Sequence, residues 1–310
     1  MITVTVVICT YNRAELLGEA LDSLTRQTAD RSSYEVIVVD NNSTDTTRET
    51  TEAFIERFDN IRIVGESAQG LSHARNRGCR EAHADWIVYM DDDARARENL
   101  VERIQYIIGA FDFDCFGGVY EPWYKYGKPD WFRDEYATNR KNLDAPGVLE
   151  KDFASCIFTI KKDVLLSLGG FPVTLGMTGE TISYGEETHL QVRMRKNGYT
   201  VGYDPSLLIY HSVNPSQLNP SWHIRSAYAA GRVYWRAFDR RPTWGSVMIF
   251  AVSAGFLFLK NLCVKTSRLL TEHYHHQNWV VETLSPAASN IGIVVEGIKI
   301  LVRRTGPAVG

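Results

Sequence analysis

The sequence predicts an α/β fold in which a parallel sheet is covered by helices on both faces. Short apolar runs rich in β-branched residues alternate with stretches of helical spacing, such as Leu17, Leu21 and Leu24. The runs are apolar throughout, as in strands buried on both faces, and the intervening helices allow right-handed crossovers. The expected strands are Val4–Cys9, Val36–Val39, Ile61–Val64 and Trp86–Met90.

The composition is that of a globular chain with an ordinary core. Its 310 residues are 44% hydrophobic and 23% charged, which excludes a disordered, collagen-like or disulfide-stapled protein. At about 100–200 residues per domain, one large domain with an appendage or two modest domains would account for the length. A net charge of -3 gives no electrostatic reason to bind nucleic acid, and no such partner is expected.

Cysteine usage and the first residues indicate a compartment. The five cysteines are an odd number with no CxxC pair, which argues against a disulfide framework and a thiolate zinc site. The apolar run Ile2–Cys9 is too short for a signal peptide and leads directly into a polar turn. We therefore expect a cytoplasmic protein.

The regular alternation ends near residue 115. The aromatic stretch Gly117–Gly147 is too long for an ordinary turn, so we expect a functional flap or binding wall, with a plain hydrophobic cluster as the alternative. The Gly-rich segment Leu175–Gly185 is a candidate lid over a ligand. The other elements expected here are a strand at Phe153–Ile160, a helix at Lys161–Leu168, a polar helix at Glu186–Lys196, a strand at Leu207–Tyr210 and helices from Ser221 onward.

Two C-terminal stretches raise the question of a membrane. Trp244–Leu259 carries no charge and ends at Lys260, but its length falls short of the roughly 20 residues that span a bilayer. Ile291–Val302 is apolar apart from Glu296 and Lys299. Helices on a membrane surface and a buried or dimerising helical region remain equal alternatives, ahead of a true span.

Three consecutive carboxylates, Asp91, Asp92 and Asp93, follow the strand Trp86–Met90 directly. Adjacent carboxylates repel one another, and a hard divalent cation, Mg2+ or Mn2+, would offset that cost. Alternation along a strand would place Asp91 and Asp93 on one side. The alternative is a solvated acidic turn that caps a helix near Glu98.

Polar residues also follow the first two strands, where ligands of parallel sheets bind. Thr10, Tyr11 and Asn12 could hold a nucleoside, and Asp40 could accept hydrogen bonds from a base or ribose. Alternatively, Asn12 caps the first helix, and Ser43 and Thr44 form turns that cap the next. Neither GxGxxG nor GxxxxGK[ST] occurs, which argues against a dinucleotide dehydrogenase and a P-loop NTPase.

The ordered set VVICTYNR, VIVVDNNSTD, GLSHARNRG and VYMDDDA resembles the family 2 glycosyltransferases. The resemblance continues through Tyr184–Leu190 and Leu208–His211. It implies a GT-A fold, the Rossmann-like fold of nucleotide-diphospho-sugar transferases, with a mixed, mainly parallel sheet. The catalytic domain would be residues 1–215, with a nucleotide-sugar half at 1–115 and an acceptor half at 116–215. Residues 216–310 would be a helical extension.

The same resemblance implies roles for single residues. Thr10, Tyr11 and Asp40 would hold the nucleoside, with Asn12 and Asp92 beside them, and Arg75 would approach the base or the phosphates. Asp91 would touch the ribose or the metal. Asp93 would be the principal ligand of the divalent cation and His211 would complete its shell. The alternative for His211 is a strand-end histidine with one backbone hydrogen bond.

Glu186-Glu187 stands where the family usually has Glu-Asp or Asp-Asp. Adjacent helical residues point about 100° apart, so both cannot face an acceptor equally. By resemblance Glu187 is the general base, and Glu186 binds the acceptor or braces the loop. The alternative is two acids favourably placed at a helix N-terminus.

The resemblance implies an inverting, metal-dependent transferase that moves a sugar from a nucleoside-diphosphate sugar to a hydroxyl. Trp123 and Trp131 would line the acceptor site, because aromatic faces pack against sugar rings. The acceptor would be a saccharide or lipid-linked molecule in cell-surface polysaccharide or glycolipid assembly, at the cytoplasmic face of the membrane. A catalytically inactive scaffold and a sugar nucleotidyltransferase are the alternatives.

Overall fold

The computed structural model describes residues 1–151, 153, 156–179, 181–270 and 274–305. The chain divides into two compact units. The first comprises residues 1–125, 134–180 and 186–212, and the second comprises 126–133, 181–185 and 213–310. Two short segments of the region that the sequence assigns to the catalytic domain therefore group with the C-terminal helices.

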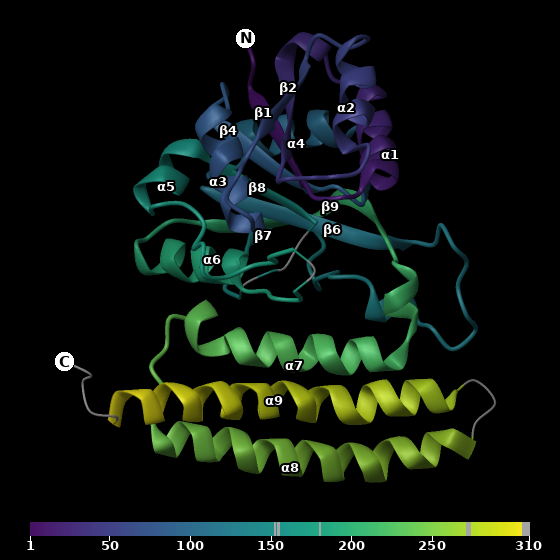
Figure 1. Ribbon diagram of the computed structural model, residues 1–310, viewed down its shortest axis with the longest axis vertical. Helices are drawn as coiled ribbons and strands as arrows, with labels where there is room; N and C mark the ends of the chain where they lie inside the picture. Colours follow the sequence, from purple (N-terminus) through teal and green to yellow (C-terminus); the bar gives the residue numbers. More distant parts are fainter. Residues whose placement is uncertain (152, 154–155, 180, 271–273, 306–310) are drawn as a thin grey trace. The chain divides into compact units, whose positions relative to one another are not determined.

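A mixed sheet forms the centre of the first unit (Figure 1). Within the described residues its order is β3-β2-β1-β4-β8-β6-β9-β5, and β7 pairs with β9. The first four strands are parallel, β8 runs antiparallel to both β4 and β6, and β9 runs parallel to β6 but antiparallel to β5 and β7. The strands are β1 Val4–Thr10, β2 Tyr34–Asp40, β3 Ile61–Gly65, β4 Trp86–Asp91, β5 Ala94–Ala96, β6 Cys115–Trp123, β7 Gly147–Val148, β8 Ile157–Lys161 and β9 Val201–Ser212.

Helices cover both faces of this sheet, as the apolar strands predict. Alternate residues of β1 serve different faces: Val6 and Ile8 pack with Leu17 and Ile104 on one side, whereas Val7 packs on the other. The first face is covered by α1, α2 and α4, and the second by α3, α5 and α6. These helices are α1 Ala14–Thr25, α2 Thr47–Ile55, α3 Leu71–Glu81, α4 Leu100–Ala110, α5 Lys162–Ser167 and α6 Glu186–Lys196, with 3-10 turns at Arg31–Ser33 and Asp134–Tyr136.

The four N-terminal strands and the helix Glu186–Lys196 are confirmed, and other predicted bounds are corrected. The strand predicted at 153–160 is β8, Ile157–Lys161, and residues 154 and 155 lie outside the described residues. The helix predicted at 161–168 is α5, Lys162–Ser167. The first seven residues of the predicted flap 117–147 belong to β6, so they are a strand and not a loop.

The strand predicted at 207–210 is the twelve-residue β9, Val201–Ser212. Asp204-Pro205 is typical of a turn, but here the backbone stays extended. The register between β6 and β9 shifts at Gly118/Val119, opposite this dipeptide. Such an irregularity accommodates a proline inside a sheet.

A close helix-to-strand approach places α3. A Cβ atom on Gly78 would lie 2.3 Å from a methyl carbon of Val7, so only glycine allows α3 to pack this near β1. Arg75 lies on the same helix one turn earlier. The packing therefore brings the arginine next to the carboxyl ends of the strands.

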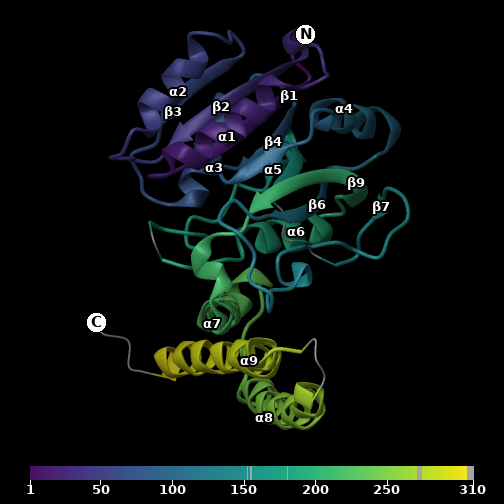
Figure 2. The ribbon, with the colours of Figure 1, turned by 90° about the vertical axis from the view of Figure 1, so that its right-hand side faces the viewer.

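The second unit contains three long helices. α9 lies between α7 and α8 in both views (Figures 1 and 2). Gly231 of α7 and Gly292 of α9 allow a tight crossing, because a Cβ atom on either would lie within 2.3 Å of the other helix's backbone. The helices are α7 Pro220–Ala237, α8 Trp244–Thr266 and α9 His276–Thr305, with 3-10 turns at Pro215–Leu218 and Ser267–Leu270.

The apolar stretch 244–259 forms the first part of α8, and the helix continues past Lys260 to Thr266. By length and composition the helical segments Trp244–Leu270 and His276–Arg303 could each cross a membrane. Core helices of soluble proteins have the same length and composition, so the side chains that these helices expose carry the further evidence.

Candidate functional site

The carboxyl ends of β1, β2 and β4 place the predicted nucleoside residues along one sheet edge. Thr10 is the register partner of Asp40, and Cys9 is the partner of Asp91. Thr10 and Asp40 are both buried. Thr10, Asp40 and Asp91 are thus neighbours, because β1, β2 and β4 end within one residue of one another in the register of the sheet.

The loops after β1 and β2 hold each other. Asn12, in the left-handed region at φ 53, accepts a hydrogen bond from the Thr44 backbone N at 2.7 Å, and its own backbone N donates to Ser43 Oγ. Asp40 accepts from the Ser43 backbone N at 2.9 Å. Asn12 and Asp40 therefore shape this edge, whatever they also contact in a ligand. Tyr11 directly precedes Asn12 and is half-buried.

The capping alternatives for this region are corrected. The residue before α1 is Arg13 and makes no side-chain cap, so Asn12 does not cap the helix. Instead Asp45 accepts from the Ala14 backbone N, and it also accepts from the backbone N and hydroxyl of Thr47. One carboxylate that sequence analysis did not single out therefore stabilises the starts of both α1 and α2.

The three aspartates contact two arginines. Asp92 lies 3.0 Å from Arg13, and Asp93 lies 2.8 Å from the same arginine. Asp91 lies 3.6 Å from Arg75. Besides the divalent cation that the sequence predicts, guanidinium groups of the chain itself therefore offset part of the repulsion within the cluster.

His211 reaches the aspartates through a strand pair that sequence analysis did not predict. The short strand β5 follows Asp93 and pairs with β9, where Ala94 is opposite His211. Nε2 of His211 lies 3.0 Å from Oδ1 of Asp93. Among the described residues, the ring is therefore paired with a carboxylate of the aspartate cluster, and the acidic turn continues into a strand before the helix.

Burial and charge shift the proton affinities in opposite directions. Burial disfavours protonated His211, but the charge and hydrogen bond of Asp93 outweigh it and raise the pKa of the ring from 6.5 to about 9. Burial also works against ionised Asp93, yet His211 and Arg13 hold the pKa of that carboxyl well below its usual range. Asp92 differs, since burial prevails over Arg13 and raises its pKa to about 6.

Arg75 is at the centre of the site and is 4% exposed. It lies 2.9 Å from Glu186 and 2.8 Å from Glu187, besides its contact with Asp91. Its guanidinium carbon lies 5.2 Å from the ring centre of Phe171. The resemblance implied an arginine directed at the base or phosphates; here it joins three carboxylates from two distant elements.

Glu186 and Glu187 are both buried at the first turn of α6, where the helix dipole favours negative charge. Sequence analysis expected the two to diverge by about 100°. The two carboxylates contact different nitrogens of one guanidinium, because a planar fork with several N–H donors can donate to two carboxylates from different directions. The dipole alternative and the catalytic role are thus compatible in this position.

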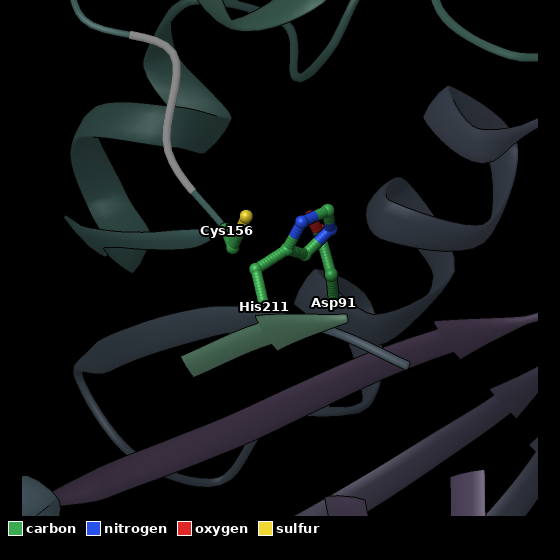
Figure 3. Close-up of side chains that lie close together, drawn as sticks. All are labelled: Asp91, Cys156 and His211. Carbon is green, nitrogen blue, oxygen red and sulfur yellow. The ribbon is translucent and has the colours of Figure 1, made fainter. Parts of the chain in front are cut away.

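A third ligand-type side chain was missed by sequence analysis. Asp91, Cys156 and His211 each present one donor atom, and these atoms lie within 4.8 Å of one another (Figure 3). Cys156 precedes β8, and its carbonyl accepts from the backbone N of Asp91. Asp91 and Cys156 are 65 positions apart in the sequence, and only the pairing of β8 with β4 reveals their proximity.

The first residues of the candidate lid are hydrogen-bonded to α3. The backbone N of Leu71 donates to the Met177 carbonyl, and the hydroxyl of Ser72 donates to that of Leu175, both at 2.9 Å. The start of the predicted lid is therefore attached to the helix that carries Arg75. Residue 180, within the same predicted lid, lies outside the described residues.

The two tryptophans of the predicted acceptor wall have different surroundings. Trp123 ends β6, and the Arg95 guanidinium carbon lies 3.2 Å from its ring centre. Trp131 belongs to the second unit, is 7% exposed and packs on Phe132 and His223. The hydrophobic-cluster alternative is therefore favoured for Trp131, and a sugar on Trp123 would share the ring with an arginine.

Known proteins resemble both the sequence and the fold. The chain is 29% identical to the glycosyltransferase AglE of Haloferax volcanii over 214 residues, which are 68% of this chain and 67% of that protein. It is 25% identical over 250 residues to the glucosyl-dolichyl phosphate glucuronosyltransferase of the same organism, covering 77% of this chain and 76% of the relative.

A solved structure shows the same architecture. The mannosyltransferase PcManGT from Pyrobaculum calidifontis, in complex with GDP-Man and Mn2+, superposes with a TM-score of 0.67 at 20% identity, over 95% of this chain and 86% of that one. The sequence profile of Glycosyl transferase family 2 matches residues 5–169. The chain therefore belongs to glycosyl transferase family 2 and is a glycosyltransferase with the GT-A fold.

Proposed function

We propose that this glycosyltransferase is an inverting, metal-dependent enzyme that moves a sugar from a nucleoside-diphosphate sugar to a hydroxyl of a lipid-linked saccharide. The observation that carries the proposal is the position of Arg75. It joins Glu186 and Glu187, the candidate acids for the acceptor, to Asp91 at the end of the donor strands. Donor and acceptor chemistry would thus take place beside one buried guanidinium.

The donor set at the end of β4 fits a divalent cation. Carboxylate oxygens and an imidazole nitrogen are ligands that suit Mn2+, and Asp93, His211 and Asp91 supply them. These three residues would hold the ion. When bound, the ion supplies positive charge that stabilises the departing nucleoside diphosphate. The Mn2+ in the complex of the Pyrobaculum mannosyltransferase supports this assignment.

The acceptor step needs one base. Glu187 would accept the proton of the attacking hydroxyl, whose oxygen then bonds to the anomeric carbon as the bond from that carbon to the diphosphate oxygen breaks. A single displacement inverts the configuration at the anomeric carbon. Glu186 shares Arg75 with Glu187 and would hold the guanidinium, and with it the base, in place.

The relatives support the acceptor class. One of them is named a glucosyl-dolichyl phosphate glucuronosyltransferase, whose name includes a sugar carried on a lipid phosphate. A lipid-linked saccharide used in cell-surface glycan assembly is therefore the acceptor class we assign. Such an acceptor would be available at the cytoplasmic face of a membrane.

A thermal-shift titration tests the donor site. The wild-type chain is titrated with UDP, GDP, dTDP and CMP, with and without Mn2+, beside the Asp93→Ala variant. We expect one diphosphate to stabilise the wild type only with the metal, by about 2.7 kcal/mol at a hundredfold excess over Kd. Metal-dependent stabilisation that persists in Asp93→Ala would remove Asp93 from the metal site. No shift with any nucleotide would favour the inactive-scaffold alternative.

A further inference from the structure

One face of α8 is an apolar stripe exposed to solvent. The exposed side chains recur three or four residues apart, the spacing that aligns them on one side of a helix. Ile249 is 69% exposed and Phe256 is 63% exposed. An exposed aromatic and aliphatic surface of this length is unusual for a soluble protein and indicates a binding surface. Its members are Trp244, Met248, Ile249, Val252, Phe256 and Leu259.

The charges around this stripe are mainly basic. Residues 244–270 contain no Asp or Glu. The acids of α9 are ion-paired: Glu282 with Arg133 and Lys265, and Glu296 with Arg232. The chain around the stripe is exposed at Arg240, Arg241 and Lys260, and α9 is exposed at Lys299 and Arg303, so five exposed bases stand against one exposed acid, Asp239.

The helix packing in this unit favours an in-plane orientation of α8 over a membrane span. α9 lies between α8 and α7 (Figure 1), and α7 is a polar helix with Arg225, Arg232 and Arg236. If α8 and α9 crossed a bilayer side by side, α7 and the paired Glu296 would be drawn into the hydrocarbon at high cost. With α8 flat on the surface, only its apolar stripe meets lipid.

We propose that α8 docks in the plane of an anionic lipid bilayer, with its stripe among the acyl chains and the basic residues at the headgroup phosphates. Apolar burial and attraction to anionic lipids act together in such helices. Trp244 is placed at the start of the helix, where an amphipathic ring suits the interface. The inference extends the proposed function, since a lipid-linked acceptor would be found at this surface, but it stands on the helix alone.

Vesicle sedimentation tests the docking. The full chain is mixed with vesicles of phosphatidylcholine, or of an equal mixture of phosphatidylcholine and phosphatidylglycerol. We expect binding to the anionic vesicles to be at least about tenfold stronger than to the neutral ones. The double variant Val252→Glu/Phe256→Glu should lose binding. Leu166→Glu, a matched change at an exposed apolar position of α5, should bind as the wild type does.

Two further measurements distinguish in-plane docking from a dimer formed through the stripe and from a membrane span. In light scattering, a wild-type dimer that Val252→Glu/Phe256→Glu splits, without vesicle binding by either chain, would assign the stripe to a second copy and overturn the proposal. Chain bound to one vesicle population should also move to fresh anionic vesicles, and failure to exchange would indicate a span and overturn in-plane docking.

Folding of the variants is checked by their melting temperatures and by the nucleotide titration described above. Because that titration reports on the donor site alone, a wild-type chain that binds nucleotide but not anionic vesicles would refute only the docking surface. A wild-type chain that binds anionic vesicles but no nucleotide would refute only the proposed donor chemistry.

Discussion

Buried acids occur at both ends of the parallel strands, and the two groups are built differently. At the amino ends, Glu35 of β2 accepts from the Thr5 hydroxyl and the His83 backbone N, both at 2.7 Å. Its other oxygen lies 2.9 Å from Nδ1 of His83 and 3.2 Å from Arg62. One carboxylate thus has four polar partners.

At the carboxyl ends of the strands, the acids outnumber the cationic side chains that contact them. Among the described residues, two arginines and one histidine face five acids, of which Asp92, Glu186 and Glu187 are buried and Asp91 and Asp93 are partly buried. Even with His211 protonated, two negative charges remain in surplus. A fully partnered acid fixes a fold, whereas a surplus of buried charge is retained where a ligand offsets it, at some cost in stability.

The largest effect expected from this comparison is that of Glu187→Gln. If Glu187 is the base, transfer should fall by about 10²- to 10⁴-fold, the usual contribution of general base catalysis. Nucleotide binding should persist, and the melting temperature should hold or rise because a surplus charge is removed. Initial rates of sugar transfer, with nucleotide titration as the control, measure this.

Glu186→Gln is the matched variant, since it removes the neighbouring charge on the same guanidinium. It should reduce transfer less than Glu187→Gln does. The opposite order of the two rates would make Glu186 the base.

Arg75→Met should have the next largest effect. Breaking a buried ion pair from one side costs about 3–5 kcal/mol, because the partners stay buried without their cation. Three carboxylates face Arg75, which is 4% exposed. Urea unfolding at neutral pH measures the loss, and Arg75→Lys should recover only part of it because an ammonium lacks the planar fork. A methionine variant as stable as the wild type would contradict the central role of Arg75.

The same contrast explains what could be predicted from sequence. Strands β1, β2 and β4 are buried on both faces, so their apolar runs are continuous and their ends locate Thr10, Asp40 and Asp91. Helix α6 shows acids at its start and bases at its end, which match the helix dipole. Local pattern thus predicts elements, and strand ends predict where a site lies.

The partners of those residues could not be predicted, because pairing across long sequence distances creates them. β5, with the sequence Ala-Arg-Ala, carries no strand signal and exists only through its ladder with β9. Cys156 reaches Asp91 only because β8 inserts between β4 and β6. The roles of Arg13 and Arg75 depend in the same way on helices whose packing no local pattern shows.

Glu35→Gln should destabilise the chain by about 1–3 kcal/mol at neutral pH, the range for leaving buried donors without a full partner, and should leave transfer unchanged. Burial works against its ionised form, but hydrogen bonds from His83 and Thr5 hold the pKa of Glu35 below its ordinary 4.5. The ionised carboxylate therefore stabilises the fold above about pH 4.5, and this stability is lost as the pH falls through the folded pKa. Urea unfolding at several pH values should show the two chains converging in acid. A difference that grows as pH falls would contradict this sign.

The smallest effects distinguish the two ends most directly. Arg62 and Arg13 are both partly exposed arginines on buried acids, with side chains 31% and 40% exposed. Arg62→Gln should cost less than about 1 kcal/mol and leave transfer unaffected, because solvent screens the pair and Glu35 keeps its other partners. Arg13→Gln should change stability equally little.

The two arginine variants should differ in metal affinity. Removing Arg13 takes a competing cation from Asp93, so the Mn2+ concentration at half-maximal nucleotide-linked stabilisation should fall by up to about fivefold, the equivalent of an exposed ion pair. Arg62→Gln, at the other end of the strands, should leave that concentration unchanged. Equal metal titrations for both variants would show that the acids at the carboxyl ends, like Glu35, are partnered for stability and not held for a ligand.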